Sequence, residues 1–219
     1  MRIESIQVGT PRVIAPDWTT SIYKSPVAGQ VYLSKYNLEG DKQADLTVHG
    51  GLDKAVNVYP IEHYAYWKQR KGLLFRRRIN LPTPNNGSFG ENFTVSGLIE
   101  DNVFIGDVYE VGASIVEISQ PRQPCWKLAR KFNQAQLPFW VQQTSKTGWY
   151  FRVVQEGEVQ AGDKFVLAKR NNPDWSITRA NQLMYTPGQS KDDIASILQC
   201  KQLSSSWTNT FNKKLKEYS

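Results

Sequence analysis

The sequence is poor in cysteine and histidine and has no long apolar run. It holds two cysteines and two histidines in 219 residues. So few cysteines exclude a disulfide framework as the source of stability and favour a reducing compartment. No stretch approaches the roughly 18 to 20 consecutive apolar residues that a membrane-spanning helix needs. Residues 1–7 include an acid and polar side chains where a secretory signal needs an apolar core. We therefore expect a cytoplasmic protein without a membrane partner.

The composition otherwise suits a globular chain. Apolar residues make up 40%, aromatic residues 12% and charged residues 21% of the sequence, which excludes global disorder and the collagen, mucin and coiled-coil classes. Lysine and arginine total 27 against 20 acidic residues, a net charge of +7. This excess indicates nucleic acid, a membrane surface or an anionic cofactor as a partner. Charge alone leaves these alternatives open.

Short β-prone runs, broken by Gly, Pro, Asn and Asp, fill the chain as far as residue 168. Two helices interrupt them, because helical spacing recurs in residues 61–71 and 138–144. A Gly-Asp turn at residues 106–107 separates two of the runs. The pattern is typical of a β-barrel or sandwich. The predicted strands are residues 27–33, 55–59, 103–104, 108–111, 114–118 and 164–168.

From residue 169 the pattern becomes helical. Serine or charged clusters at Ser176, residues 191–193 and residues 204–206 mark the starts of amphipathic segments. The predicted helices are near residues 176–185, 191–199 and 203–217. We therefore predict a β domain over residues 1–168 and a three-helix domain over residues 169–219. The second domain is too short to build a large core, so we expect it to dock on the barrel or on a partner.

The glycine pair Gly50-Gly51 marks the first candidate site. Its bare backbone amides lie beside His49 and Lys54, a combination that suits an anionic ligand. On composition alone, however, the favoured interpretation is a hairpin whose glycines supply positive φ and whose histidine caps a neighbouring carbonyl. A second glycine-rich stretch, residues 87–93, lacks the Gly-Lys-Ser/Thr of a phosphate-binding loop and is a weak signal alone.

Cys125 marks the other candidate site, between Arg122 and Lys127 in a stretch with two prolines. Nearby cations favour the thiolate, which attacks electrophiles and binds soft metals, whereas a buried small hydrophobe fits such a stretch poorly. Cys200 follows apolar residues at helical spacing and fits the core. No residues have the spacing of a closed zinc site, and a hydrolytic dyad of Cys125 with His49 stays formally open. We infer that a metal, if bound, arrives already chelated by an organic cofactor.

Six short motifs occur in a fixed order along the chain, and together they resemble the MOSC superfamily and, within it, bacterial proteins of the YiiM type. Residues 169–219 resemble the three-helix domain found behind this subfamily. The resemblance implies a mainly β fold: a closed antiparallel β-barrel with peripheral helices and a small C-terminal three-helix domain. The motifs are residues 24–27, 38–45, 48–51, 59–64, 89–92 and 120–125.

The same resemblance implies binding of the molybdenum cofactor, a phosphorylated pterin whose dithiolene holds the metal; pyridoxal phosphate is not expected. It implies an oxidoreductase that detoxifies N-hydroxylated compounds such as 6-N-hydroxylaminopurine by removing oxygen. A soft thiolate suits molybdenum, and cations and bare amides suit a phosphate. In this family pattern the thiolate on the metal is Cys125, further catalytic residues are Lys24 and Glu62, and the residues around the cofactor are His49, Gly50, Gly51, Lys54, Asn92 and Arg122. Glu62 alternatively complements the dipole of its helix.

The expected partners are a small N-hydroxylated substrate and an external electron donor of the flavodoxin, ferredoxin or flavoprotein type. The basic run over residues 68–78 is either a solvated helix end or a docking patch for such an acidic donor. A homodimer stays open. One competing function is a cofactor or sulfur carrier with a persulfide on Cys125. A nucleic-acid-binding module is the other, but no recognition signature is visible, so we expect no stable nucleic-acid binding.

Overall fold

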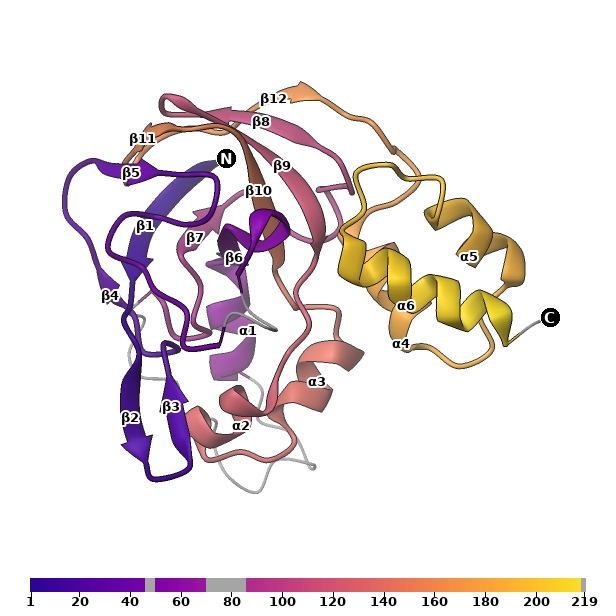
Figure 1. The fold of residues 1–219 in the computed structure, drawn as a ribbon, viewed down its shortest axis with the longest axis horizontal. Helices are drawn as coiled ribbons and strands as arrows, with labels where there is room; N and C mark the ends of the chain where they lie inside the picture. The colour runs from indigo at the N-terminus through magenta and orange to yellow at the C-terminus, as the bar shows by residue number, and fades with distance from the viewer. Residues whose placement is uncertain (46–49, 70–85, 218–219) are drawn as a thin grey trace.

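The computed structural model describes residues 1–45, 50–69 and 86–217 (Figure 1). His49 and residues 70–78 of the basic run lie outside the described residues. The longest described helix has 12 residues, and none in these ranges combines the length and apolar character needed to cross a membrane.

Within the described residues, strands predominate as far as Lys169, with four helical segments between them, and three helices follow. The strands are β1 (Arg2–Val8), β2 (Arg12–Ala15), β3 (Trp18–Thr20), β4 (Ser25–Pro26), β5 (Val31–Leu33), β6 (Val56–Pro60), β7 (Phe93–Ser96), β8 (Val108–Val111), β9 (Ser114–Pro121), β10 (Trp149–Gln155), β11 (Gly157–Val159) and β12 (Val166–Lys169). The helices are a 3-10 turn η1 (Leu52–Lys54) and the α-helices α1 (Glu62–Gln69), α2 (Trp126–Phe132), α3 (Leu137–Gln143), α4 (Ile177–Tyr185), α5 (Lys191–Ile197) and α6 (Ser205–Lys216).

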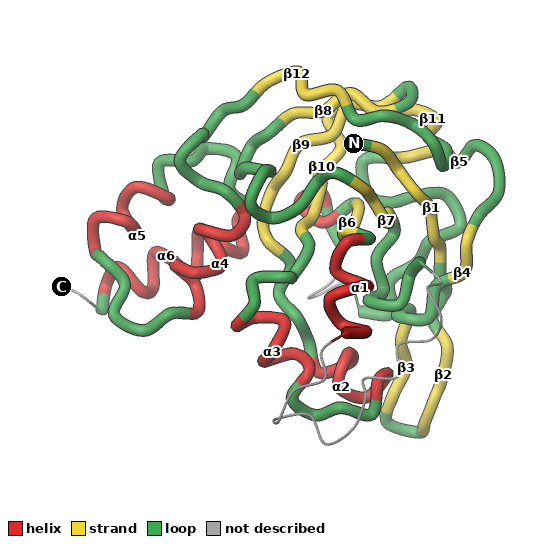
Figure 2. The backbone as a smooth tube through the Cα atoms, turned by 180° about the vertical axis from the view of Figure 1, so that it is seen from behind, coloured by secondary structure: helices red, strands yellow, loops and turns green. Residues whose placement is uncertain are grey.

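Eight strands form one curled sheet in the order β12-β8-β9-β10-β6-β7-β1-β4 (Figures 1 and 2). Its neighbours are antiparallel except β6 and β7, which run parallel. The sheet is a half-barrel, and within the described ranges its edge strands β12 and β4 do not pair with each other. Residues 162–165 approach β1 instead, where Ile3 N donates to Asp163 O at 2.9 Å. The mainly β class is confirmed, whereas a closed, wholly antiparallel barrel is not.

The strands predicted at residues 55–59, 108–111, 114–118 and 164–168 are confirmed as β6, β8, β9 and β12. β8 and β9 form a hairpin whose turn contains Gly112 at φ +56°. Residues 103–104 form no strand, which corrects the prediction there. The Asp107 carboxylate accepts hydrogen bonds from Phe104 N at 3.1 Å and from Arg170 Nη2 at 2.9 Å, so the turn at residues 106–107 closes a loop rather than a hairpin. Of the predicted run at residues 27–33 only residues 31–33 form a strand, β5, and Gly29 before it has φ +79°.

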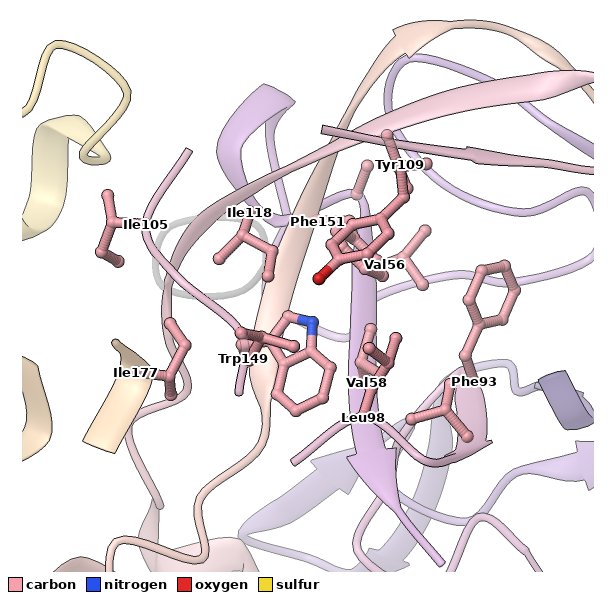
Figure 3. Packing of buried hydrophobic residues seen from close by; sticks show 14 of the residues in the cluster. Val56, Val58, Phe93, Leu98, Ile105, Tyr109, Ile118, Trp149, Phe151 and Ile177 are labelled. Atoms are coloured by element: carbon pink, nitrogen blue, oxygen red, sulfur yellow. The ribbon is translucent and has the colours of Figure 1, made fainter. Parts of the chain in front are cut away.

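The main hydrophobic core lies inside the curl of the sheet. Trp149, Phe151 and Tyr109 pack there with the valines of β6 (Figure 3). The same cluster continues through Ile177 to Trp207 in the C-terminal helices, so the three-helix domain docks on the sheet as expected. A second, separate cluster lies beneath α1, α2 and α3 and includes Tyr59, Trp67, Phe89, Leu128 and Trp140.

Each C-terminal helix begins after a serine that caps it. Ser176 Oγ accepts from Arg179 N, Ser190 Oγ from Asp193 N, and Ser204 Oγ from Trp207 N. These bonds satisfy amide groups that a helix start leaves without partners. The three predicted helices are therefore confirmed as α4, α5 and α6, and those near residues 61 and 138 as α1 and α3. The sequence prediction missed α2, which begins directly after Cys125.

Candidate functional site

A pocket open to solvent lies where the chain after β3 meets the loop at residues 41–44, the turn η1 and the start of α2. It brings together residues that are far apart in the sequence. Six of the predicted site residues line it: Lys24, Gly50, Lys54, Asn92, Arg122 and Cys125.

Two described residues of the predicted set do not line this pocket. Gly51 is exposed and is the N-cap of η1, at φ +83°. Glu62 is exposed at the start of α1, and its Oε1 accepts a hydrogen bond from Gly97 N at 2.7 Å. This bond and its place in the first helical turn agree with the alternative, structural role of Glu62. His49 lies outside the described residues.

Cys125 is half-buried at the pocket wall, in extended backbone with φ −109° and ψ 166°. Arg122 and Lys127 line the same pocket, so the cationic surroundings predicted for the thiol are present. Cys200 is buried in the main core, where burial raises its pKa to about 11. The two thiols thus have different environments, one open to ligands and one enclosed.

Arg122 is a buried cation with one of its donors uncommitted. It is 5% exposed, and its Nη2 donates to Phe89 O at 2.8 Å. Its Nη1 is buried without a hydrogen-bond partner in the described part of the chain, as are Ser21 Oγ and Asn57 Oδ1 in the same pocket lining. Buried polar atoms without partners cost free energy, so their gathering at one wall indicates a place for a polar ligand.

Lys24 is held by Asp41 at the back of the pocket. Lys24 Nζ lies 2.5 Å from Asp41 Oδ1, and the side chains are 7% and 1% exposed. Asp41 also accepts from Gly9 N at 2.8 Å and from Asn92 Nδ2 at 2.9 Å. Burial lowers the pKa of Lys24, while Asp41 and Glu91 act in the opposite direction. The pair therefore keeps a cation within a poorly solvated wall.

Glu91 organises the glycine-rich stretch at residues 87–92. Its buried carboxylate accepts from Gly87 N at 2.7 Å, Phe89 N at 3.0 Å and the Tyr64 hydroxyl. Gly90 needs to be glycine, because it has φ +79° and a Cβ there would lie 2.8 Å from Ile22 Cγ1. The stretch is thus a shaped wall of the pocket rather than a phosphate loop.

Sequence reasoning missed the roles of Asp41, Glu91, Lys131 and Tyr150. Lys131 donates through Nζ to Ile22 O at 3.0 Å and Gly87 O at 3.2 Å, joining two walls from behind. Tyr150 lines the pocket from β10, and burial raises its pKa while Arg122 opposes the shift. Asp41 and Glu91 lie within recognised motifs, which was the available signal. Lys131 and Tyr150 carry none.

Known proteins resemble this chain in both its β part and its C-terminal helices. Residues 45–166 match the MOSC domain, and residues 175–217 match the YiiM-like, 3-alpha helix domain. The chain is 43% identical to the Bacillus subtilis protein YflK over 96% of this chain and 92% of that protein. The crystal structure of YiiM from Geobacillus stearothermophilus superimposes with a TM-score of 0.80 at 40% identity, covering 98% of each chain. A Gibberella moniliformis protein named "Reductase" is 32% identical over 84% of this chain, which spans 31% of that protein.

Proposed function

This chain belongs to the MOSC family, in its YiiM-like branch with a C-terminal three-helix domain, and from that premise we propose that it is a molybdenum cofactor-dependent reductase of N-hydroxylated compounds. The observation that carries the proposal is the buried Nη1 of Arg122, which has no hydrogen-bond partner among the described residues and lies in the pocket that also holds Cys125. The fungal relative named "Reductase" supports oxidoreductase chemistry.

The pocket residues fit the donor requirements of that cofactor. Cys125 offers a thiol in the pocket, and a soft thiolate suits a soft metal. Lys42, Lys54 and Lys127 line the same pocket and suit the phosphate of the pterin. Arg122 Nη1 is available to a polar atom of the ligand, and Gly50 has no side chain to obstruct close approach. We expect these groups to bind the cofactor jointly.

The cofactor, when bound, supplies the two-electron chemistry that removes oxygen from the N-hydroxyl group. The protein supplies binding and protons. Departing oxygen and the amine nitrogen both gain protons, and Lys24 Nζ is a buried donor at the pocket wall. Asp41 orients that ammonium through Oδ1, and Asn92 Nδ2 donates a hydrogen bond to Asp41 Oδ2, which holds the carboxylate in place. We assign proton delivery to Lys24. Because Glu62 lies outside the pocket, we propose for it only the role of a more distant proton relay.

The proposal is tested by replacing the two thiols separately. Cys125→Ala and Cys125→Ser should abolish reduction of 6-N-hydroxylaminopurine by protein purified from molybdate-supplemented cells, with reduced viologen as the donor. Cys200→Ala is the matched control, because Cys200 is enclosed in the main core, and it should keep the activity. Molybdenum per chain, by elemental analysis, provides the second measurement. Full turnover in both Cys125 variants, or wild-type protein without molybdenum, would overturn the proposal.

A carrier function predicts a different state of the same cysteine. Intact-mass analysis of Cys125 in freshly purified protein would show an added sulfur atom if the chain carries a persulfide. A persulfide together with molybdenum-independent sulfur transfer would replace the reductase proposal with the carrier alternative.

A further inference from the structure

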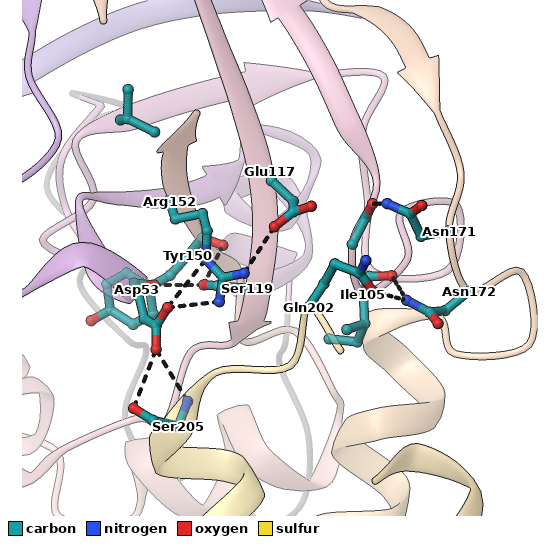
Figure 4. Close-up of polar contacts among 12 residues, drawn as sticks. Asp53, Ile105, Glu117, Ser119, Tyr150, Arg152, Asn171, Asn172, Gln202 and Ser205 are labelled. Carbon is teal, nitrogen blue, oxygen red and sulfur yellow. Dashed lines mark hydrogen bonds and ion pairs between the residues drawn. The ribbon is translucent and has the colours of Figure 1, made fainter. Parts of the chain in front are cut away.

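Asp53 connects the C-terminal domain to the pocket wall. Its Oδ2 accepts from Ser205 N at 3.1 Å and from Ser205 Oγ at 3.3 Å, at the first residue of α6 (Figure 4). Asp53 itself lies in η1, between Leu52 and the pocket residue Lys54. One side chain therefore contacts the start of α6 while its own backbone forms part of the turn beside the pocket.

The same carboxylate is fixed from the sheet. Asp53 Oδ1 accepts from Arg152 Nη2 at 2.6 Å and from Arg152 Nε at 3.1 Å, and Arg152 Nη1 reaches Glu117 Oε1 at 2.8 Å. The Asp53 carbonyl accepts from Ser119 Oγ at 2.6 Å, and Ser119 O accepts from Ser204 N at 2.9 Å. The contact thus joins η1, β9, β10 and α6 in one hydrogen-bonded group (Figure 4).

We propose that Asp53 is a positioning residue through which the three-helix domain fixes η1, and with it Lys54 and Gly50, at the wall of the pocket. α6 contributes two donors to the carboxylate, so weakening its attachment loosens the turn that carries Lys54. Asp53 also stabilises the charged form of Lys54, whose pKa burial lowers. The identity of the pocket ligand rests on the proposed function, whereas the mechanical link from α6 to η1 does not.

Ser205→Pro removes the hydrogen bonds between α6 and the Asp53 carboxylate with little effect on the helix. Ser205 is the first residue of α6, where proline is well tolerated because the amide there makes no helical hydrogen bond. The preceding Ser204 has φ −59° and ψ 151°, the extended conformation that proline favours before it. The substitution removes both donors to Asp53. Asp53→Ala removes the carboxylate from the other side.

The matched control is a second polar contact between the domains. Thr178 Oγ1 in α4 donates to Asp101 Oδ1 at 2.6 Å, and neither residue lines the pocket described above. Asp101→Ala therefore weakens the attachment of the same domain without touching η1.

The first measurement is independent of the cofactor. Lys54 N donates to Gly51 O at 2.9 Å, so hydrogen exchange of this amide reports on η1. We expect about tenfold faster exchange in Ser205→Pro and Asp53→Ala and wild-type exchange in Asp101→Ala. Unchanged exchange in the first two variants, or an equal increase in Asp101→Ala, would overturn the link.

The second measurement is retention of molybdenum on dialysis of the full chain. We expect about tenfold faster loss from Ser205→Pro and Asp53→Ala than from wild type or Asp101→Ala. Equal retention in all four proteins would show that η1 does not serve ligand binding and would overturn the positioning role. Wild-type protein without molybdenum would instead refute the proposed function, and the exchange measurement would still decide the link.

Discussion

Lys131 Nζ lies 3.0 Å from the carbonyl oxygen of Ile22, so a lysine of α2 holds the chain segment that forms the opposite wall of the pocket. Its second acceptor is Gly87 O at 3.2 Å, and its ammonium lies 5.1 Å from the centre of the Tyr23 ring. Both carbonyls can accept from a neutral amine as well as from an ammonium. The contact is therefore compatible with either protonation state.

The protonation of Lys131 predicts a rise of stability with pH. Burial lowers its pKa from 10.5 to about 8 in the folded protein, so between these values the unfolded chain binds more protons than the folded one. The free energy of unfolding should then rise by at most about 3 kcal/mol as the pH increases through this window. Below about pH 8 the folded protein carries the full cost of burying the Lys131 charge. Urea denaturation of wild type and Lys131→Met, from pH 7 to 10.5, measures the difference.

The difference between these two proteins reports on Lys131 together with the charges that act on it, Glu91, Arg122 and Lys24. Lys201→Met is the control for removal of a lysine, since Lys201 is exposed in a turn. A Lys131→Met difference that varies with pH no more than the Lys201→Met difference would contradict the prediction.

The buried pair of Lys24 and Asp41 predicts an asymmetric mutational cycle. Asp41→Ala removes the ion-pair partner of the Lys24 ammonium and the acceptor of Gly9 N, and leaves Asn92 Nδ2 with Gln7 O at 3.2 Å. We expect a loss of about 3 to 5 kcal/mol in the free energy of unfolding, because a lone buried charge is costly. Lys24→Met added to Asp41→Ala should recover part of that loss. Denaturation of both variants tests this, and a double variant that is less stable than Asp41→Ala would contradict it.

Local signals explain why the C-terminal helices could be predicted, whereas the order and pairing of the strands in the sheet could not. Ser176, Ser190 and Ser204 each cap a helix a few residues away, so sequence and structure report the same contact. The parallel pairing of β6 with β7 joins segments more than thirty residues apart and leaves no such trace. The short helix α2 was hidden because the two prolines before Cys125 suggested a stiff loop. Its end is set by Asn133 in the left-handed conformation, at φ 48°.

Most of the candidate site was predictable from motifs, and Lys54 from its place beside the glycine pair. Lys24, Asn92, Arg122 and Cys125 belong to motifs and line one pocket. Glu62 also belongs to a motif, yet its carboxylate binds Gly97 N away from the pocket, as its place in the first turn of α1 favours. Supporting contacts such as that of Lys131 could not be predicted from the sequence, because folding brings their partners together from distant segments.

The two cysteines should differ sharply in reactivity. Cys125 lines an open pocket, whereas Cys200 is 5% exposed and burial raises its pKa to about 11. Reaction requires the thiolate and access, so cofactor-free native protein at pH 7.5 should take up one equivalent of iodoacetamide, at Cys125. Intact mass after timed labelling measures this. Cys125→Ala should take up none until it is unfolded, and labelling of Cys200 first would contradict the structure.

Two arginines should show opposite consequences when each is replaced by methionine. Among the described residues, the Arg122 side chain donates to Phe89 O and its buried Nη1 has no hydrogen-bond partner, so in cofactor-free protein Arg122→Met should change the free energy of unfolding by no more than about 1 kcal/mol. Arg170 instead binds both oxygens of the fully buried Asp107, at 2.9 Å each, and Arg170→Met should destabilise by about 3 kcal/mol.

Ligand binding should follow the reverse order, because an unpaired buried donor is useful only when a ligand accepts its hydrogen bond. Arg122→Met should lose molybdenum on dialysis at least tenfold faster than wild type, corresponding to about 1.4 kcal/mol, and Arg170→Met at the wild-type rate. Denaturation and elemental analysis of the same preparations give both quantities. If Arg122→Met were strongly destabilised yet retained its molybdenum, Arg122 would be a structural residue and its free donor would have no part in binding.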